Sequence, residues 1–308
     1  MFKHMFEKAK MRGFLALPMQ AERLTAEDIC ILQLALGDGE IQEQAWRKWQ
    51  TIADFDALTT GSILIPAAYF HTAQYRSGGP AERMRGAYRK NWLLTKLLQE
   101  RLMPLVCDIA EAQIPCVLGD DVPLAFEYFA VPSARPVFEI TLYCSAPAQA
   151  KLAQFLIQRG LKPARSYGWQ LTDQAIVRPR IFDLSQMPGG LTDSASLPLP
   201  ILGAAAQLCC TFRAARPHPL MRFLDMGMVL RAHSKNIDWA EIGGWISQQG
   251  KVANFRQLLR FYANTIGLDL PAQTHALMES CSGMSAHSKL ARQLRSTAAN
   301  LRQNLTLR

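Results

Sequence analysis

Hydrophobic and polar positions alternate most regularly near the middle of the chain, from Val137 to Cys144. Side chains two apart on a strand point to the same side, so this segment predicts a strand with one apolar face and one mixed face. Glu139 and Thr141 are neighbours on the mixed face. The strand therefore places a carboxylate and a hydroxyl side by side.

A shorter apolar segment, Ile114–Leu118, predicts a second strand and runs directly into the polar turn Gly119-Asp120-Asp121. If the two strands pair, this turn lies close to Glu139 and Thr141. A polar turn beside polar strand positions is one way in which a small α/β unit binds phosphate and metal ions. The same aspartates could also form a solvated turn closed by a side-chain hydrogen bond.

Two further strands are expected at Tyr167–Leu171 and Ile176–Leu184, where apolar residues again alternate. Asp183 lies near the end of the second strand, either as part of a site or simply as a polar strand end. Residues 187–200 are rich in Gly, Ser and Pro and predict the clearest linker in the chain.

Apolar residues at helical spacing predict helices on both sides of these strands. The first begins at Thr25, with Asp28 completing a near capping box. Trp46 and Trp49 lie three apart on the next helix, and we expect both in the core. Beyond the linker, helices are expected at 201–215, 221–232, 239–249 and 252–265, with a helical tail from 285.

Residues 82–105 give the most regular helical pattern, and the helix continues or restarts after Pro104. We expect its inner stripe to contain Trp92, Leu93, Leu97 and Leu105. Its outer faces carry basic residues, which could be a solvated surface or could steer a polyanion such as a nucleotide. These residues are Arg83, Arg85, Arg89, Lys90, Lys96 and Arg101.

Together these elements predict an α+β fold in which a small mixed β-sheet is flanked by helical regions. We expect an N-terminal helical region over residues 1–105 and an α/β core over residues 106–190. A C-terminal helical domain with a basic tail is expected over residues 191–308.

Composition, charge and missing motifs exclude several kinds of site and partner. The formal net charge is +9, and residues 281–308 carry five basic residues and no acid. This tail could be a solvated helix or could bind an acidic partner, but it has no aromatic residues to stack bases, which argues against nucleic acid. Motifs of the G-x-S-x-G and G-x-G-x-x-G types are absent, which excludes the common serine-nucleophile and dinucleotide sites.

No segment is apolar for long enough to cross a membrane, and the N-terminus is not typical of a signal peptide. The seven cysteines are an odd number and lack the spacing of zinc ligands. We therefore expect reduced thiols in a cytoplasmic protein without membrane contact.

The order of several short segments resembles that of the bacterial uncharacterised nucleotidyltransferase family, part of the polymerase-beta-like superfamily. The resemblance covers roughly residues 25–270. Trp46-Arg47-Lys48-Trp49 resembles the W-x-x-W helix of that family, and Arg89-Lys90-Asn91 resembles the basic start of the helix before the first strand. Ile114-Pro115-Cys116-Val117-Leu118 resembles the first strand itself.

Later positions follow the same order. Arg135 corresponds to the arginine before the catalytic strand, and Asp183-Leu184 to the third carboxylate segment. Asp225 and Asp238-Trp239 fit the C-terminal pattern.

The resemblance implies a nucleotidyltransferase-like core with Glu139, Thr141 and Asp183 at the catalytic motif positions. It implies that an NTP would contact positions in the turn and in the loop before the catalytic strand, namely Gly119, Asp120, Asp121 and Arg135. If the site is active, magnesium ions would be held by Glu139, Asp183 and Asp120.

The departures from the family pattern occur at the positions that take part in catalysis in the family. Where the family has Lys-Gly, this chain has Asp120-Asp121, and where the family has two aspartates, it has Glu139 and Thr141. Ser185 stands where histidine is usual. A threonine hydroxyl is neutral and cannot bridge two dications, while two carboxylates in the turn repel a triphosphate. These substitutions favour a catalytically degenerate protein with a binding, regulatory or accessory role, and the resemblance implies a possible protein partner.

Two alternatives stay open. In the first, the chain is an active magnesium-dependent nucleotidyltransferase in which Asp120 or Asp121 joins Glu139 and Asp183 in a rearranged carboxylate site. In the second, the fold is different, for example a helical adaptor with an incidental α/β insert.

Overall fold

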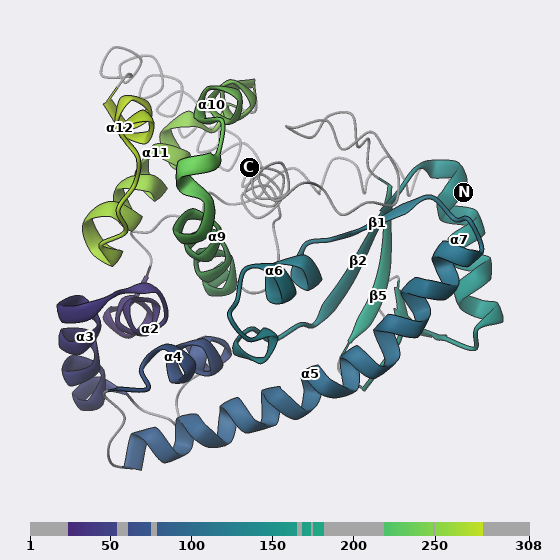
Figure 1. Ribbon diagram of the computed structural model, residues 1–308, viewed down its shortest axis with the longest axis horizontal. Helices are drawn as coiled ribbons and strands as arrows, with labels where there is room; N and C mark the ends of the chain where they lie inside the picture. The colour runs from purple at the N-terminus through teal and green to yellow at the C-terminus, as the bar shows by residue number, and fades with distance from the viewer. Residues whose placement is uncertain are drawn as a thin grey trace, which may run out of the picture.

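The computed structural model describes residues 24–53, 61–74, 79–164, 168–173, 175–181, 219–248 and 250–279. The fold is α+β: helices surround one five-stranded mixed sheet, as the sequence predicted (Figure 1). The expected linker, the helix at 201–215 and the tail from 285 lie outside the described residues. Among those that are described, no helix is both long and apolar enough to cross a membrane.

The sheet has the strand order β1-β2-β5-β4-β3. The pair β2–β5 is parallel, and the other three pairs are antiparallel. Strand β3 was not expected from the sequence, because only three residues pair and one of them is Pro163. The strands are β1 (Cys116–Gly119), β2 (Glu139–Cys144), β3 (Lys162–Ala164), β4 (Gly168–Gln170) and β5 (Ile176–Ile181).

Helix α7 (Ala146–Gln158) begins the crossover that makes β2 and β5 parallel. Ser145 caps it by accepting a hydrogen bond from the backbone of Ala148, and Pro147 lies in its first turn. Gly160 follows the helix with φ of 77°, a conformation that glycine adopts at little cost.

The apolar face of the sheet packs on α7 and on the second half of α5 (Gly79–Glu111), which forms one hydrophobic core. In Figure 1, α5 runs beneath both the sheet and the N-terminal helices. The sheet contributes Ile140, Leu142, Cys144 and Val177, and the helices contribute Leu98, Leu102, Leu105, Leu152 and Leu156.

A second hydrophobic core joins the described N-terminal helices to the C-terminal ones. It combines α2 (Ala26–Leu36), α3 (Gly39–Ile52), η2 (Gly61–Leu64) and α4 (Ile65–His71) with the C-terminal helices. Those are α9 (Pro219–His233), α10 (Trp239–Gln248), α11 (Val252–Phe261) and the π-helical turn η6 (Tyr262–Ile266). The remaining elements of this half are η5 (Ser234–Asn236) and α12 (Ala272–Glu279).

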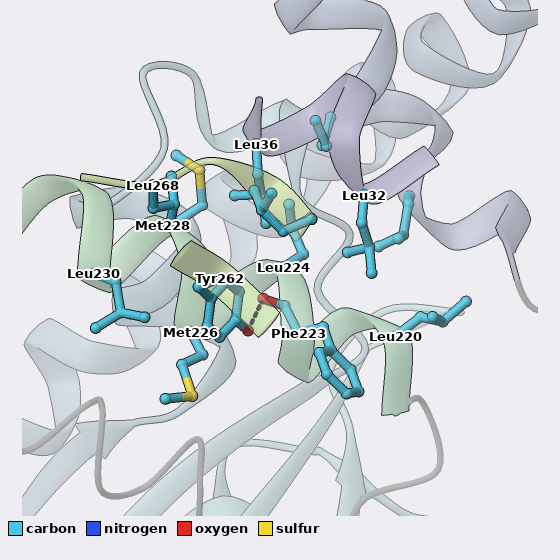
Figure 2. Packing of buried hydrophobic residues seen from close by; sticks show 14 of the residues in the cluster. Leu32, Leu36, Leu220, Phe223, Leu224, Met226, Met228, Leu230, Tyr262 and Leu268 are labelled. Atoms are coloured by element: carbon cyan, nitrogen blue, oxygen red, sulfur yellow. Dashed lines mark hydrogen bonds between the residues drawn. The ribbon is translucent and has the colours of Figure 1, made fainter. Parts of the chain in front are cut away.

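Figure 2 shows how these two groups of helices interlock, with Leu32 and Leu36 of α2 beside Leu224 of α9. The hydroxyl of Tyr262 donates a hydrogen bond to the backbone oxygen of Phe223 at 2.6 Å, which connects η6 to α9. The capping box at Thr25 is confirmed. So is the burial of both tryptophans expected in the core.

Helix α5 continues through Pro104 without a break, so the expected boundary between residues 105 and 106 falls inside it. The predicted inner stripe of this helix is wrong at three of its four positions. Leu105 is buried, but the side chains expected with it face solvent, namely Trp92, Leu93 and Leu97. The buried face instead carries two polar residues, Asn91 and Thr95, and Asn91 Nδ2 donates to the backbone oxygen of Ser133 at 2.6 Å. Because these polar groups are hydrogen-bonded, burying them costs little, and Leu93 and Leu97 lie on the exposed side of the helix.

Candidate functional site

Strand β2 lies between β1 and β5 in the sheet, and its mixed face carries Glu139 and Thr141. Thr141 lies opposite Gly119 of β1 and opposite Arg178 of β5. Its Oγ1 is 3.2 Å from Oε1 of Glu139, within hydrogen-bond distance. The expectation that Glu139 and Thr141 are neighbours, beside the end of β1, is therefore confirmed.

Strand β5 adds two arginines to the same face, Arg178 and Arg180. Arg178 Nη1 lies 2.9 Å from Glu139 Oε2, and Arg180 Nη2 lies 2.9 Å from Glu139 Oε1. Each carboxylate oxygen therefore faces its own guanidinium. The carboxylate is mostly buried, while both arginine side chains are partly exposed.

This pairing changes what Glu139 can do. Charge-assisted hydrogen bonds of this kind are among the stronger ones in proteins, and they occupy the lone pairs that a metal ion would need. A dication at this carboxylate would also lie close to two positive charges. The described residues thus do not fit a two-metal site.

Sequence reasoning missed Arg178 and Arg180, although the signal was present. The two arginines stand two apart in a segment predicted as a strand, so both had to lie on one face. What the sequence did not reveal is that β5 runs parallel to β2 in a register that aims them at Glu139.

The turn after β1 holds Asp120 in an unusual backbone conformation, with φ of 57° and ψ of −108°. Such a conformation costs on the order of 1–3 kcal/mol for a non-glycine residue and persists only when its surroundings fix it. One such contact is the hydroxyl of Tyr143, which donates to Asp120 Oδ2 at 2.7 Å. The buried carboxylate thus connects the turn to β2.

Gly119 leaves room for this contact. A Cβ at position 119 would overlap the ring of Tyr143, which lies directly against the glycine backbone. Glycine is required here because of the close approach of the ring.

We expect Gly119→Ala to lower the free energy of unfolding by about 1–2 kcal/mol, because the methyl group must displace the Tyr143 ring from its bond to Asp120. Urea denaturation measures the change. Gly86→Ala on α5 is a control without overlap, since nothing lies within 4 Å of a Cβ at that position, and it should raise the stability by about 0.5–1 kcal/mol because alanine is the better helix former. A Gly119→Ala variant that is as stable as the wild-type protein would show that the ring moves freely.

Asp121 and Arg135 belong to a different, buried cluster of four charged residues. Arg135 Nε and Nη2 donate to the two carboxylate oxygens of Asp225 at 2.5 and 2.8 Å. Asp121 Oδ1 accepts from Arg135 at 3.0 Å and from Arg222 at 2.7 Å. Arg222 closes the ring with a 3.1 Å bond to Asp225.

The cluster connects three parts of the chain. Asp121 is the first residue of α6 (Asp121–Glu127), and Arg135 follows the turn η3 (Pro132–Ala134). Arg222 and Asp225 lie one turn apart on α9. The remaining guanidinium nitrogen of Arg135, Nη1, donates to the backbone oxygens of Asp121 and Pro136 at 3.2 and 3.0 Å.

Electrostatic attraction within the cluster favours the ionised forms of Asp121 and Arg135. Burial alone would raise the pKa of Asp121, but the attraction of Arg135 and Arg222 outweighs it and lowers the pKa below its ordinary value. Burial alone would lower the pKa of Arg135, and the carboxylates of Asp225 and Asp121 raise it instead. The arrangement therefore fixes α6 and the loop before β2 to α9.

The structure divides the predicted site residues into two groups. Gly119, Asp120, Glu139 and Thr141 lie at the paired strands β1 and β2. Asp121 and Arg135, predicted to bind nucleotide, lie in the buried charge cluster together with Asp225. Asp183, predicted as a catalytic residue and metal ligand, lies outside the described residues.

In the part of the chain that the structure describes, no group of three or more His, Cys, Asp or Glu side chains is arranged to hold a metal ion. Asp238, another position of the resemblance, accepts hydrogen bonds from the backbone of Ala240 and Glu241 and so caps α10.

No family model matches the chain, and comparison with curated proteins and with solved structures gives no significant match.

Proposed function

We propose that this chain is a nucleotidyltransferase-like cytoplasmic protein that does not transfer nucleotides and that acts as a binding, regulatory or accessory protein. The order of its motifs supports the first part of the proposal. The observation that carries the second part is the pairing of Glu139 with Arg178 and Arg180.

The charge balance explains why this pairing opposes catalysis. In a partly exposed site, two unit charges 4 Å apart interact by about 4 kcal/mol, and the repulsion doubles for a divalent ion. Two guanidinium groups beside a single carboxylate therefore disfavour magnesium at the mixed face. Thr141 supplies no charge that would compensate.

The same excess of positive charge favours the binding of an anion. Two guanidinium groups share one carboxylate, so the triad Glu139, Arg178 and Arg180 carries one excess positive charge. Arginine binds phosphate oxygens through parallel N–H groups. A nucleotide that binds this protein is thus held by Arg178 and Arg180 without magnesium, in competition with Glu139.

This binding mode predicts that removing the charge of Glu139 strengthens nucleotide binding, whereas in a metal enzyme the same change would weaken it. Glu139→Gln removes the competing charge but keeps the size of the side chain. We expect it to strengthen magnesium-independent ATP binding by about tenfold, a change of about 1.4 kcal/mol. Calorimetric titration with ATP, CTP, GTP and UTP, with and without magnesium, measures the effect.

Glu43→Gln is the matched control, because Glu43 pairs with Arg47 on the surface of α3, away from the sheet. A parallel assay for pyrophosphate release tests for transfer. Magnesium-dependent turnover that disappears in Glu139→Gln would refute the proposal and establish the active enzyme with a rearranged carboxylate site.

A further inference from the structure

Within the part of the chain that the structure describes, the outward face of α5 carries four large apolar side chains that are about half exposed. The exposed fractions are 48% for Trp92, 54% for Leu93, 45% for Leu97 and 59% for Met103. Single exposed apolar residues are common, but Trp92, Leu93 and Leu97 lie within two helical turns of one another, and Met103 follows less than two turns further along the helix.

The geometry of the helix makes this surface a ridge. Leu93 and Leu97 are four residues apart, and Trp92 and Met103 are eleven apart, so each pair lies along one side of the helix. The opposite side of α5 is already packed on the sheet through Leu98 and Leu102. We call Trp92, Leu93, Leu97 and Met103 the α5 ridge.

Positive charge surrounds the α5 ridge. Residues 89–103 contain four basic residues and one acid, Glu100. Lys96 is four residues from Trp92 and three from Leu93, and Arg89 is one turn before them. Within the described residues, no ion pair joins a carboxylate to any of the four basic side chains, which are Arg89, Lys90, Lys96 and Arg101.

We propose that the α5 ridge binds an amphipathic helix of a partner protein, whose apolar stripe is flanked by aspartates and glutamates. Apolar anchors at helical spacing fit such a stripe, and the surrounding cations fit its acidic flanks. A second copy of this chain is disfavoured, because it would bring two basic faces together. This inference rests on the accessory role proposed above and names the partner for it.

A display selection with the full-length protein tests the chemistry of the occupant. Peptides of about 18 residues are selected on the wild-type chain from an unbiased library. Peptides that also bind Leu97→Glu are removed by counter-selection. We expect enriched sequences to repeat apolar residues at i, i+3, i+4 and i+7, to be rich in acids, and to become helical on binding.

Affinities of the best peptide, measured by fluorescence anisotropy, then locate the site. Leu97→Glu and Lys96→Glu should each weaken binding at least tenfold, and raising the salt concentration should weaken binding to the wild-type protein. Ile157→Glu is the matched control: Ile157 is 59% exposed on α7, outside the α5 ridge, and its replacement should leave the affinity unchanged.

Several outcomes would overturn the inference. The first two are a selection without enrichment and enriched peptides that are basic or extended. The third is a loss of peptide affinity in Ile157→Glu equal to that in Leu97→Glu. The fourth is a protein that binds phosphatidylserine vesicles but no peptide. Failure here is distinguishable from failure of the proposed function. If the protein binds no acidic helix and shows no magnesium-dependent transfer, only this inference is refuted. If it shows transfer activity, the proposed function is refuted, and peptide binding is then judged by itself.

Discussion

Replacing Arg135 by methionine is expected to lower the free energy of unfolding by about 3–5 kcal/mol. The arginine is fully buried and donates to both oxygens of Asp225 and to Asp121. Methionine preserves much of the side-chain volume but removes the charge. Two carboxylates then share Arg222 alone, and an uncompensated buried charge is far more costly than a missing surface pair.

Urea denaturation of the wild-type and variant proteins measures this difference. Arg85→Met is the matched control, because Arg85 pairs with Glu82 on the exposed side of α5 and should contribute less than about 1 kcal/mol. Adding Asp225→Leu to Arg135→Met should recover part of the loss, since it leaves Asp121 and Arg222 as a single ion pair. A loss below 1 kcal/mol in the single variant would mean that water reaches the cluster and replaces the guanidinium.

Gly227→Val should lower the free energy of unfolding by about 2–3 kcal/mol through overpacking. Gly227 lies where α9 packs against Leu36 of α2. A Cβ at this position would overlap the side chain of Leu36 of α2 and lie 3.1 Å from Cε1 of Tyr262. Both neighbours are fully buried, so neither can move aside without disturbing the shared core.

Gly244→Val on α10 is the control for this variant, because a Cβ there meets nothing within 4 Å. The control should differ little from wild type, since valine is a somewhat better helix former than glycine. If the two variants were equally stable, the contact between α2 and α9 would not limit how closely these helices approach.

The sequence predicted those features that depend on local pattern. Alternation over residues 137–144 gave β2 and the neighbouring positions of Glu139 and Thr141, and the spacing of Thr25 and Asp28 gave the first helix cap. In each case the determining residues lie within a few positions of one another. Such signals need no knowledge of the rest of the fold.

Features that depend on distant residues could not be predicted in the same way. The face that α5 buries includes Asn91, whose side chain donates a hydrogen bond to the backbone of Ser133, 42 residues later in the chain. The pairing of Arg135 with Asp225 spans 90 residues, and that of Glu139 with Arg180 spans 41. Periodicity shows that a residue is on a face, but only the tertiary structure shows what that face meets.

The core that the N-terminal helices share with the C-terminal helices has a consequence for synthesis on the ribosome. Helix α2 leaves the ribosome before α9 and η6, against which its apolar face packs. About 165 residues separate the end of α3 from the start of α9. At about 5–20 residues per second, the nascent N-terminal helices would wait roughly 10–30 s for their partners. During that interval the exposed leucines of α2 are a natural target for a chaperone, and a chain that terminates before α9 would remain one.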